Sequence, residues 1–159
     1  MTSKDAFTDE EWTRLLRAPF VAGMAISLAD PGGPIEAFKE TSATLKAVLA
    51  AEQGGELVGA IAQDAVAHAR EHKNPLAGFK PSSAANAGVE ILAELKAAHG
   101  IVAEKATPEE AEAFATWLQA VAQAAADAAK EGGFFGFHAE RVSEGEQRML
   151  DSIRDALAA

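Results

Sequence analysis

Three residues spaced four apart form the clearest chemical pattern in the sequence: Asp64, His68 and His72. On an α-helix, side chains four residues apart share one face, about 6 Å apart along the axis. Two imidazoles at this spacing can chelate a divalent metal such as Zn²⁺ or Ni²⁺, and the carboxylate can add an oxygen ligand or orient His68. The alternative is a polar face near the end of a helix, where the helix dipole favours His.

A second candidate for cation binding is the turn that begins at Asp30 and reaches Glu36. Carboxylate oxygens are the ligands that a hard cation such as Ca²⁺ prefers. Two carboxylates are too few for high affinity, so the sequence predicts at most a weak site here.

Three phenylalanines interrupt a glycine-rich stretch between two expected helices: Phe134, Phe135 and Phe137. In water they would expose several hundred Å² of apolar surface, which monomers rarely tolerate. We therefore expect at least two of them to be buried near Trp12 or Phe20. The alternative is an exposed interaction loop that binds a protein or an apolar ligand. Three polar residues would then line its rim: His138, Glu140 and Arg141.

Other catalytic patterns are missing from the sequence. There is no Cys, which excludes disulfides and thiolate sites. There is no Glu-x-x-His motif for a di-iron bundle, no Gly-x-Ser-x-Gly and no P-loop. We expect no catalytic residue and no cofactor apart from the divalent metal considered above.

The elements that position these residues are expected to be helices. Apolar residues recur with the 3.6-residue period in every long segment, and no run alternates with period two. The 159 residues predict one all-α domain, a bundle of six or seven mostly antiparallel helices in which residues 1–7 are loose. Trp12 and Trp117 are expected in its core. So are these residues: Phe38, Leu45, Ile61, Val89, Leu92, Leu95, Phe114, Leu118, Val121, Leu150 and Ile153.

Capping residues and helix breakers set the expected boundaries. Thr8 with Glu11, and Thr107 with the acids that follow it, are typical of helix starts, and so is Ser143 with Glu146. Pro19 fits the first turn of a helix or a kink, and Gly100 fits a helix end. The expected helices span about 8–17, 19–29, 35–52, 56–72, 82–99 and 107–130, and a last helix begins at 143.

The chain is acidic, with a net charge of −10. This charge repels nucleic acids and anionic lipids, so a basic protein partner, a second copy of the chain or a cation fits better. No apolar run approaches the ~18 residues of a membrane span. Residues 1–7 are polar and lack the hydrophobic region of a signal peptide. These two observations predict a cytoplasmic protein.

Two short stretches resemble known families. The Gly-Phe-Phe-Gly-Phe run followed by Val142-Ser143-x-x-Glu146 resembles the C-terminus of an uncharacterised family of small bacterial all-helical proteins. The turn from Ala29 to Glu36 is similar to the acidic inter-helix loop of TerB-like tellurite-resistance domains, although Pro31 stands where that family has Gly. The second resemblance implies an all-α fold, and a link to metal ions and stress complexes.

These observations favour a non-enzymatic helical bundle that acts through protein interaction or through stress-related binding of a ligand or cation. One alternative is a metal-dependent enzyme that uses the face of Asp64, His68 and His72. The other is a carrier of an apolar ligand.

Overall fold

The computed structural model describes residues 2–29, 44–48, 54–83, 85–131 and 144–158. Within these residues every regular element is helical and there is no strand, which confirms the all-α prediction. A short helical segment covers residues 44–48. The other elements are η1 (Lys4–Ala6), α1 (Asp9–Ala29), α3 (Gly55–Arg70), α4 (Ala87–Lys105), α5 (Pro108–Glu131) and α6 (Glu144–Leu157). None of these described helices is long and apolar enough to cross a bilayer.

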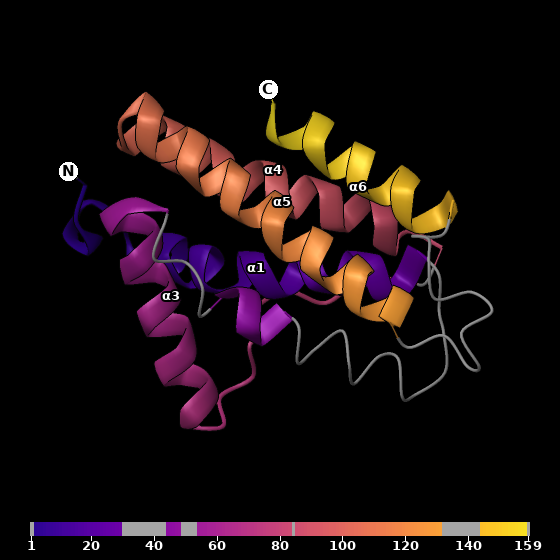
Figure 1. The fold of residues 1–159 in the computed structure, drawn as a ribbon. Coiled ribbons are helices and arrows are strands. Elements are labelled where there is room, and N and C mark those ends of the chain that lie inside the picture. The colour runs from indigo at the N-terminus through magenta and orange to yellow at the C-terminus, as the bar shows by residue number, and fades with distance from the viewer. Residues whose placement is uncertain (1, 30–43, 49–53, 84, 132–143, 159) are drawn as a thin grey trace.

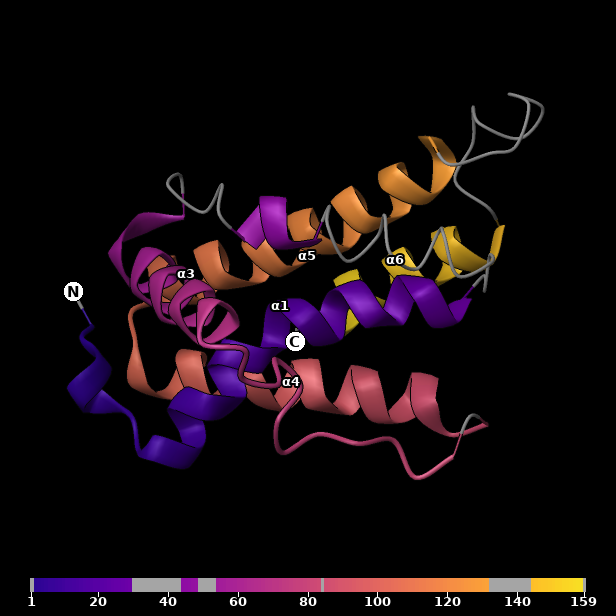
Figure 2. The same cartoon turned by 90° about the horizontal axis from the view of Figure 1, so that it is seen from below.

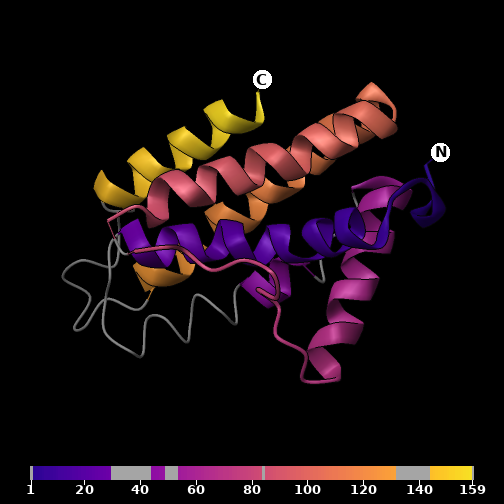
Figure 3. The same cartoon turned by 180° about the vertical axis from the view of Figure 1, so that it is seen from behind.

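Helix α1 lies at the centre of the bundle and contacts each of α3, α4, α5 and α6. Figures 1 and 3 show α4, α5 and α6 running beside α1, whereas α3 crosses near its N-terminal end. The segment 71–83 returns beside α1 and α4 before α4 begins, as Figures 2 and 3 show. It meets α1 near the middle of that helix, where Arg17 Nη1 donates a hydrogen bond to the Ala77 carbonyl oxygen.

Helix α1 is continuous through Pro19, so the prediction of separate helices at 8–17 and 19–29 is wrong. Proline removes one backbone hydrogen bond from a helix interior and costs about 3 kcal/mol. Apolar side chains are buried on both sides of Pro19, including Leu15 and Ile26. Their burial against the neighbouring helices offsets that cost and keeps the helix intact.

Three other helix boundaries differ from the prediction. Helix α4 begins at Ala87 rather than at residue 82. Helix α4 passes through Gly100 and ends at Lys105, because glycine costs a helix only about 1 kcal/mol and Val102 extends the buried face beyond it. Helix α3 ends at Arg70, and His72 has a left-handed backbone with φ 57°. His72 therefore lies outside the helix that was expected to carry it.

Most of the predicted core is buried. The buried residues are Trp12, Ile61, Leu95, Phe114, Trp117, Leu118, Val121, Leu150 and Ile153. Leu45 and Leu92 are half-buried, and Phe38 lies outside the described residues. Val89 is 74% exposed, which corrects the prediction that it faces inward. It lies about 200° around the α4 axis from the buried Ile91.

Two predicted capping boxes form as expected. The Thr8 backbone N–H donates to Glu11, and the Glu11 backbone N–H donates back to the Thr8 hydroxyl oxygen. Thr107 and Glu110 make the same reciprocal pair at the start of α5. The predicted box at Ser143 lies outside the described residues.

The segment before α1 contacts the bundle. Thr2 donates to the two carboxylate oxygens of Glu110 from its backbone nitrogen (2.8 Å) and its hydroxyl (2.6 Å). Phe7 is buried and its ring centroid lies 5.7 Å from that of Trp12. Hydrogen bonds and an aromatic contact thus join residues 2–7, for which the sequence predicted a loose segment, to the bundle.

Candidate functional site

The structure does not assemble the predicted metal site. Asp64 accepts hydrogen bonds from Lys4 Nζ (2.8 Å) and Trp12 Nε1 (2.9 Å). Burial alone would raise the pKa of Asp64, but these two donors lower it below its usual value. His68 is half-buried on α3, and His72 lies beyond the helix end. Across the described part of the chain, no three His, Asp or Glu side chains come close enough to hold a metal ion.

The other predicted sites lie outside the described residues. They are the cation candidates Asp30 and Glu36 and the interaction loop with Phe134, Phe135, Phe137, His138, Glu140 and Arg141. Their expected roles stay predictions.

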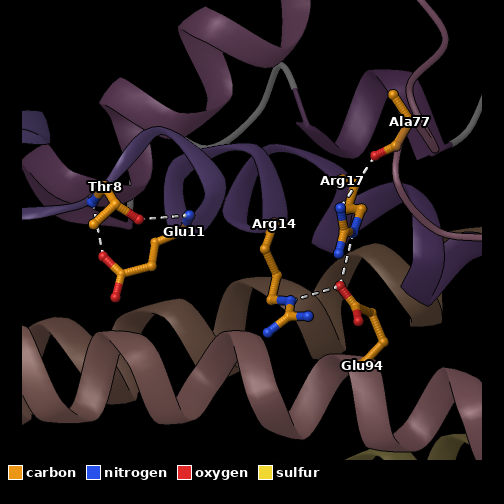
Figure 4. Close-up of polar contacts among 6 residues, drawn as sticks. All are labelled: Thr8, Glu11, Arg14, Arg17, Ala77 and Glu94. Carbon is orange, nitrogen blue, oxygen red and sulfur yellow. Dashed lines mark hydrogen bonds and ion pairs between the residues drawn. The ribbon is translucent and has the colours of Figure 1, made fainter.

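A different feature emerges along the first half of α1. A groove of about 610 Å³ runs between α1, α4 and the segment that contains Gly78. Figure 4 shows the polar contacts along it. The lining residues are Thr8, Asp9, Glu10, Glu11, Thr13, Arg14, Arg17, Gly78 and Ile101. Its size lies in the range of small-molecule sites in proteins.

The inner end of the groove is built on a buried ionic cluster. The Glu94 Oε1 atom on α4 accepts from Arg17 Nε at 2.7 Å and from Arg14 Nε at 3.1 Å, both on α1. The side chains of Arg17 and Glu94 are each only 9% exposed, whereas Arg14 is 39% exposed. One carboxylate faces two guanidinium groups, so the cluster carries one excess positive charge.

Gly78 lets the returning segment close over this cluster. Its φ of 85° is a left-handed conformation that favours glycine, and a Cβ atom there would lie 2.6 Å from Arg17 Nη1. The preceding residue, Ala77, accepts a hydrogen bond from the same Nη1 atom at 3.1 Å. Arg17 thus joins α1, α4 and the segment that returns along α1.

Arg14 is the guanidinium that remains available. Its Nε atom is paired with Glu94, and its two terminal nitrogens make no hydrogen bond or ion pair with the described residues. Figure 4 shows this guanidinium between α1 and α4, joined by a dashed line only to Glu94. The terminal nitrogens carry four N–H donors in the fork geometry that matches a carboxylate or a phosphate.

The outer end of the groove is acidic. Glu11 is occupied, because Lys105 Nζ donates to it at 2.6 Å. That hydrogen bond is the main reason why the pKa of Glu11 is lowered, and the Thr8 backbone N–H adds to it. Asp9 and Glu10 are exposed and form no ion pair with the described residues. The groove therefore has negative charge at one end and positive charge at the other.

The sequence analysis did not identify Arg14, Arg17 or Glu94. A signal was present, because Arg17 falls within the apolar face of α1 and Glu94 falls beside the inward Ile91 and Leu95 of α4. Opposite charges at inward positions of two helices indicate a buried pair. The pairing itself spans 77 residues, which local periodicity cannot reveal.

Comparisons of the chain with protein-family models, with curated proteins and with solved structures gave no match. The functional interpretation therefore depends on the site alone.

Proposed function

We propose that this protein is a non-enzymatic binding module whose groove along α1 holds a charged ligand. The observation that carries the proposal is Arg14, a guanidinium that lines the groove and has its terminal nitrogens unpaired among the described residues. Arg17 and Glu94 fix the wall behind it with buried ionic hydrogen bonds. A preorganised wall of this kind lowers the entropic cost of binding.

The chemistry of the groove favours binding over catalysis. Its strongest polar groups are guanidinium groups, which stay protonated across the physiological pH range and so do not exchange protons with a substrate. Its lining contains no His or Lys, and its carboxylates without an ion pair to the described residues, Asp9 and Glu10, are exposed to solvent, where a carboxylate is a weak base. Thr13 uses its hydroxyl to donate to the Asp9 carbonyl oxygen at 2.8 Å.

We also propose a cellular location and a class of partner for the protein. We place the protein in the cytoplasm, since the 159 residues contain no Cys. The acidic net charge of −10 favours a basic protein partner or a cation over nucleic acid. A TerB-like stress role remains compatible with a binding module. A metal-dependent enzyme is less favoured because Asp64 is already paired with Lys4 and Trp12.

A thermal-shift screen of small charged metabolites tests the proposal. We expect at least one compound to raise the melting temperature of the wild type and to lose this effect in Arg14→Gln. Arg148→Gln is the matched control, because Arg148 is exposed on α6 and does not line the groove. If no compound distinguishes Arg14→Gln from the control, the groove is not a ligand site.

A further inference from the structure

The charges in the groove specify the ligand further, given the proposed function. We infer that the ligand is a zwitterion with separated charges: a carboxylate bound by Arg14 and an ammonium group bound by Glu10 or Asp9. An ω-amino acid and a short peptide have this chemistry.

The positive end favours a carboxylate. Arg14 can offer two parallel N–H groups to its two oxygens. The cluster of Arg14, Arg17 and Glu94 has a net charge of only +1, because the Glu94 carboxylate neutralises one of the two guanidinium charges. A doubly charged phosphate would exceed that charge and would be repelled by Glu94 and by the acids at the outer end.

The negative end favours an ammonium group. Asp9 and Glu10 are the groove acids without ion-pair partners in the described part of the chain, since Glu11 is held by Lys105. Glu10 lies one helical turn before Arg14, yet the structure directs Arg14 to Glu94 on α4 instead. Both charges therefore remain free for a ligand that spans them.

The helix geometry sets the distance between the two charges. Measured along the axis of α1, Arg14 lies about 6 Å from Glu10 and about 7.5 Å from Asp9. An α-amino acid carries its ammonium and carboxylate groups on the same carbon atom and cannot reach both ends. A chain of several methylene groups or a short peptide can span them.

The middle of the groove suits such a chain. Ile101 lines the groove from α4, in the stretch between Glu94 and Lys105. Thr13 lines it from α1, with its hydroxyl already used by the Asp9 carbonyl oxygen. The middle therefore offers apolar contact between two charged ends.

Three compounds of similar length separate the contributions: 6-aminohexanoate, hexanoate and hexylamine. Their affinities for the full chain are measured by ¹H–¹⁵N chemical-shift titration. We expect 6-aminohexanoate to bind at least about tenfold more tightly than either singly charged compound, since one ionic hydrogen bond contributes about 1.5–3 kcal/mol. The shifts should centre on the first half of α1 and on Ile101.

Two variants then show which charged group of the ligand binds at each end of the groove. Arg14→Gln should weaken the binding of 6-aminohexanoate and of hexanoate to the same extent. Glu10→Gln together with Asp9→Asn should weaken the binding of 6-aminohexanoate to about the level of hexanoate, and should not weaken the binding of hexanoate. Arg148→Gln and Glu112→Gln, both of exposed residues outside the groove, are the matched controls.

The outcomes separate this inference from the proposed function. If hexanoate binds as tightly as 6-aminohexanoate in an Arg14-dependent way, the groove is a simple anion site and the zwitterion inference is wrong. If none of the three compounds binds, the inference is also wrong. The proposed function fails only if the wider screen finds no Arg14-dependent ligand.

Discussion

Arg14 and Arg17 share one oxygen of Glu94 but differ in their surroundings. Arg17 is buried and makes a second hydrogen bond to the Ala77 carbonyl oxygen. Arg14 is partly exposed and keeps its terminal nitrogens free of the described residues. We therefore assign a stabilising role to Arg17 and a ligand-binding role to Arg14.

The first prediction concerns Arg17. Arg17→Gln should lower the free energy of unfolding by about 3 kcal/mol, because it leaves buried Glu94 with only the partly exposed Arg14. Urea denaturation measures this change. The double variant Arg17→Met with Glu94→Leu should regain most of the loss, since it removes both buried charges. A double variant as unstable as Arg17→Gln would show that packing, not charge, sets the cost.

The second prediction concerns Gly78. Gly78→Ala should destabilise the protein by about 1–2 kcal/mol, because its φ of 85° is left-handed and the new methyl group would crowd Arg17 Nη1. Gly100→Ala is the matched control. Nothing lies within 4 Å of a Cβ atom at Gly100 inside α4, so that change should stabilise by about 1 kcal/mol. Equal melting temperatures for the two variants would contradict the close approach at Gly78.

At the scale of the helices, local signals predicted the starts at Thr8 and Thr107 but not the start of α4, which begins at Ala87 rather than at residue 82. The capping boxes at Thr8 and Thr107 depend on residues three apart in sequence, and both formed as predicted. The continuity of α1 through Pro19 and of α4 through Gly100 depends instead on burial against other helices. Tertiary packing therefore overrode two local breaking signals.

In the candidate site, too, the local sequence pattern and the tertiary packing gave different answers. The Asp64, His68 and His72 pattern assumed a helix through residue 72, and α3 ends two residues earlier. Asp64 was also paired with Lys4 and Trp12, whose positions 60 and 52 residues away depend on the fold. The sequence contained the buried charges of the groove, but only the packing of α1 against α4 brings Arg14 and Arg17 to Glu94.

The third prediction tests a helix start. Thr107→Ala should cost about 1 kcal/mol, because the Glu110 backbone N–H loses the hydroxyl acceptor that caps α5. Urea denaturation again gives the value. Thr107→Ser, which keeps the hydroxyl, should stay near the wild type. A Ser variant as unstable as the Ala variant would contradict the role of the cap.

At the scale of the whole molecule, burial makes stability depend on pH. Burial lowers the pKa of His99 below its usual 6.5, although a backbone hydrogen bond involving Ala111 partly opposes the shift. Glu110 affects stability in a lower pH range, because its pKa is lower than that of His99. Burial would raise its pKa, but hydrogen bonds from Thr107 and Thr2 hold it at about 2, so the native carboxylate stays charged in mild acid.

The fourth prediction follows from His99. Its folded-state pKa is depressed, so its contribution to stability is complete above pH 6.5 and is lost as the pH falls through the folded-state value. Urea denaturation at a series of pH values from 7.5 downward should show that the free energy of unfolding of the wild type decreases once the pH falls below about 6.5. His99→Gln should flatten this part of the profile. An unchanged slope in the variant would assign the pH dependence to other groups.

The last prediction concerns the groove and the separate roles of its two arginines. The most direct measurement is the melting temperature of Arg14→Gln with and without saturating 6-aminohexanoate, beside the wild type and Arg148→Gln. Without ligand, Arg14→Gln should cost less than about 1 kcal/mol, because the ion pair is partly exposed. With ligand, the wild type and Arg148→Gln should become more stable, whereas Arg14→Gln should not respond. An Arg14→Gln variant that is stabilised as much as the wild type would contradict the assignment of Arg14 as the ligand-binding residue.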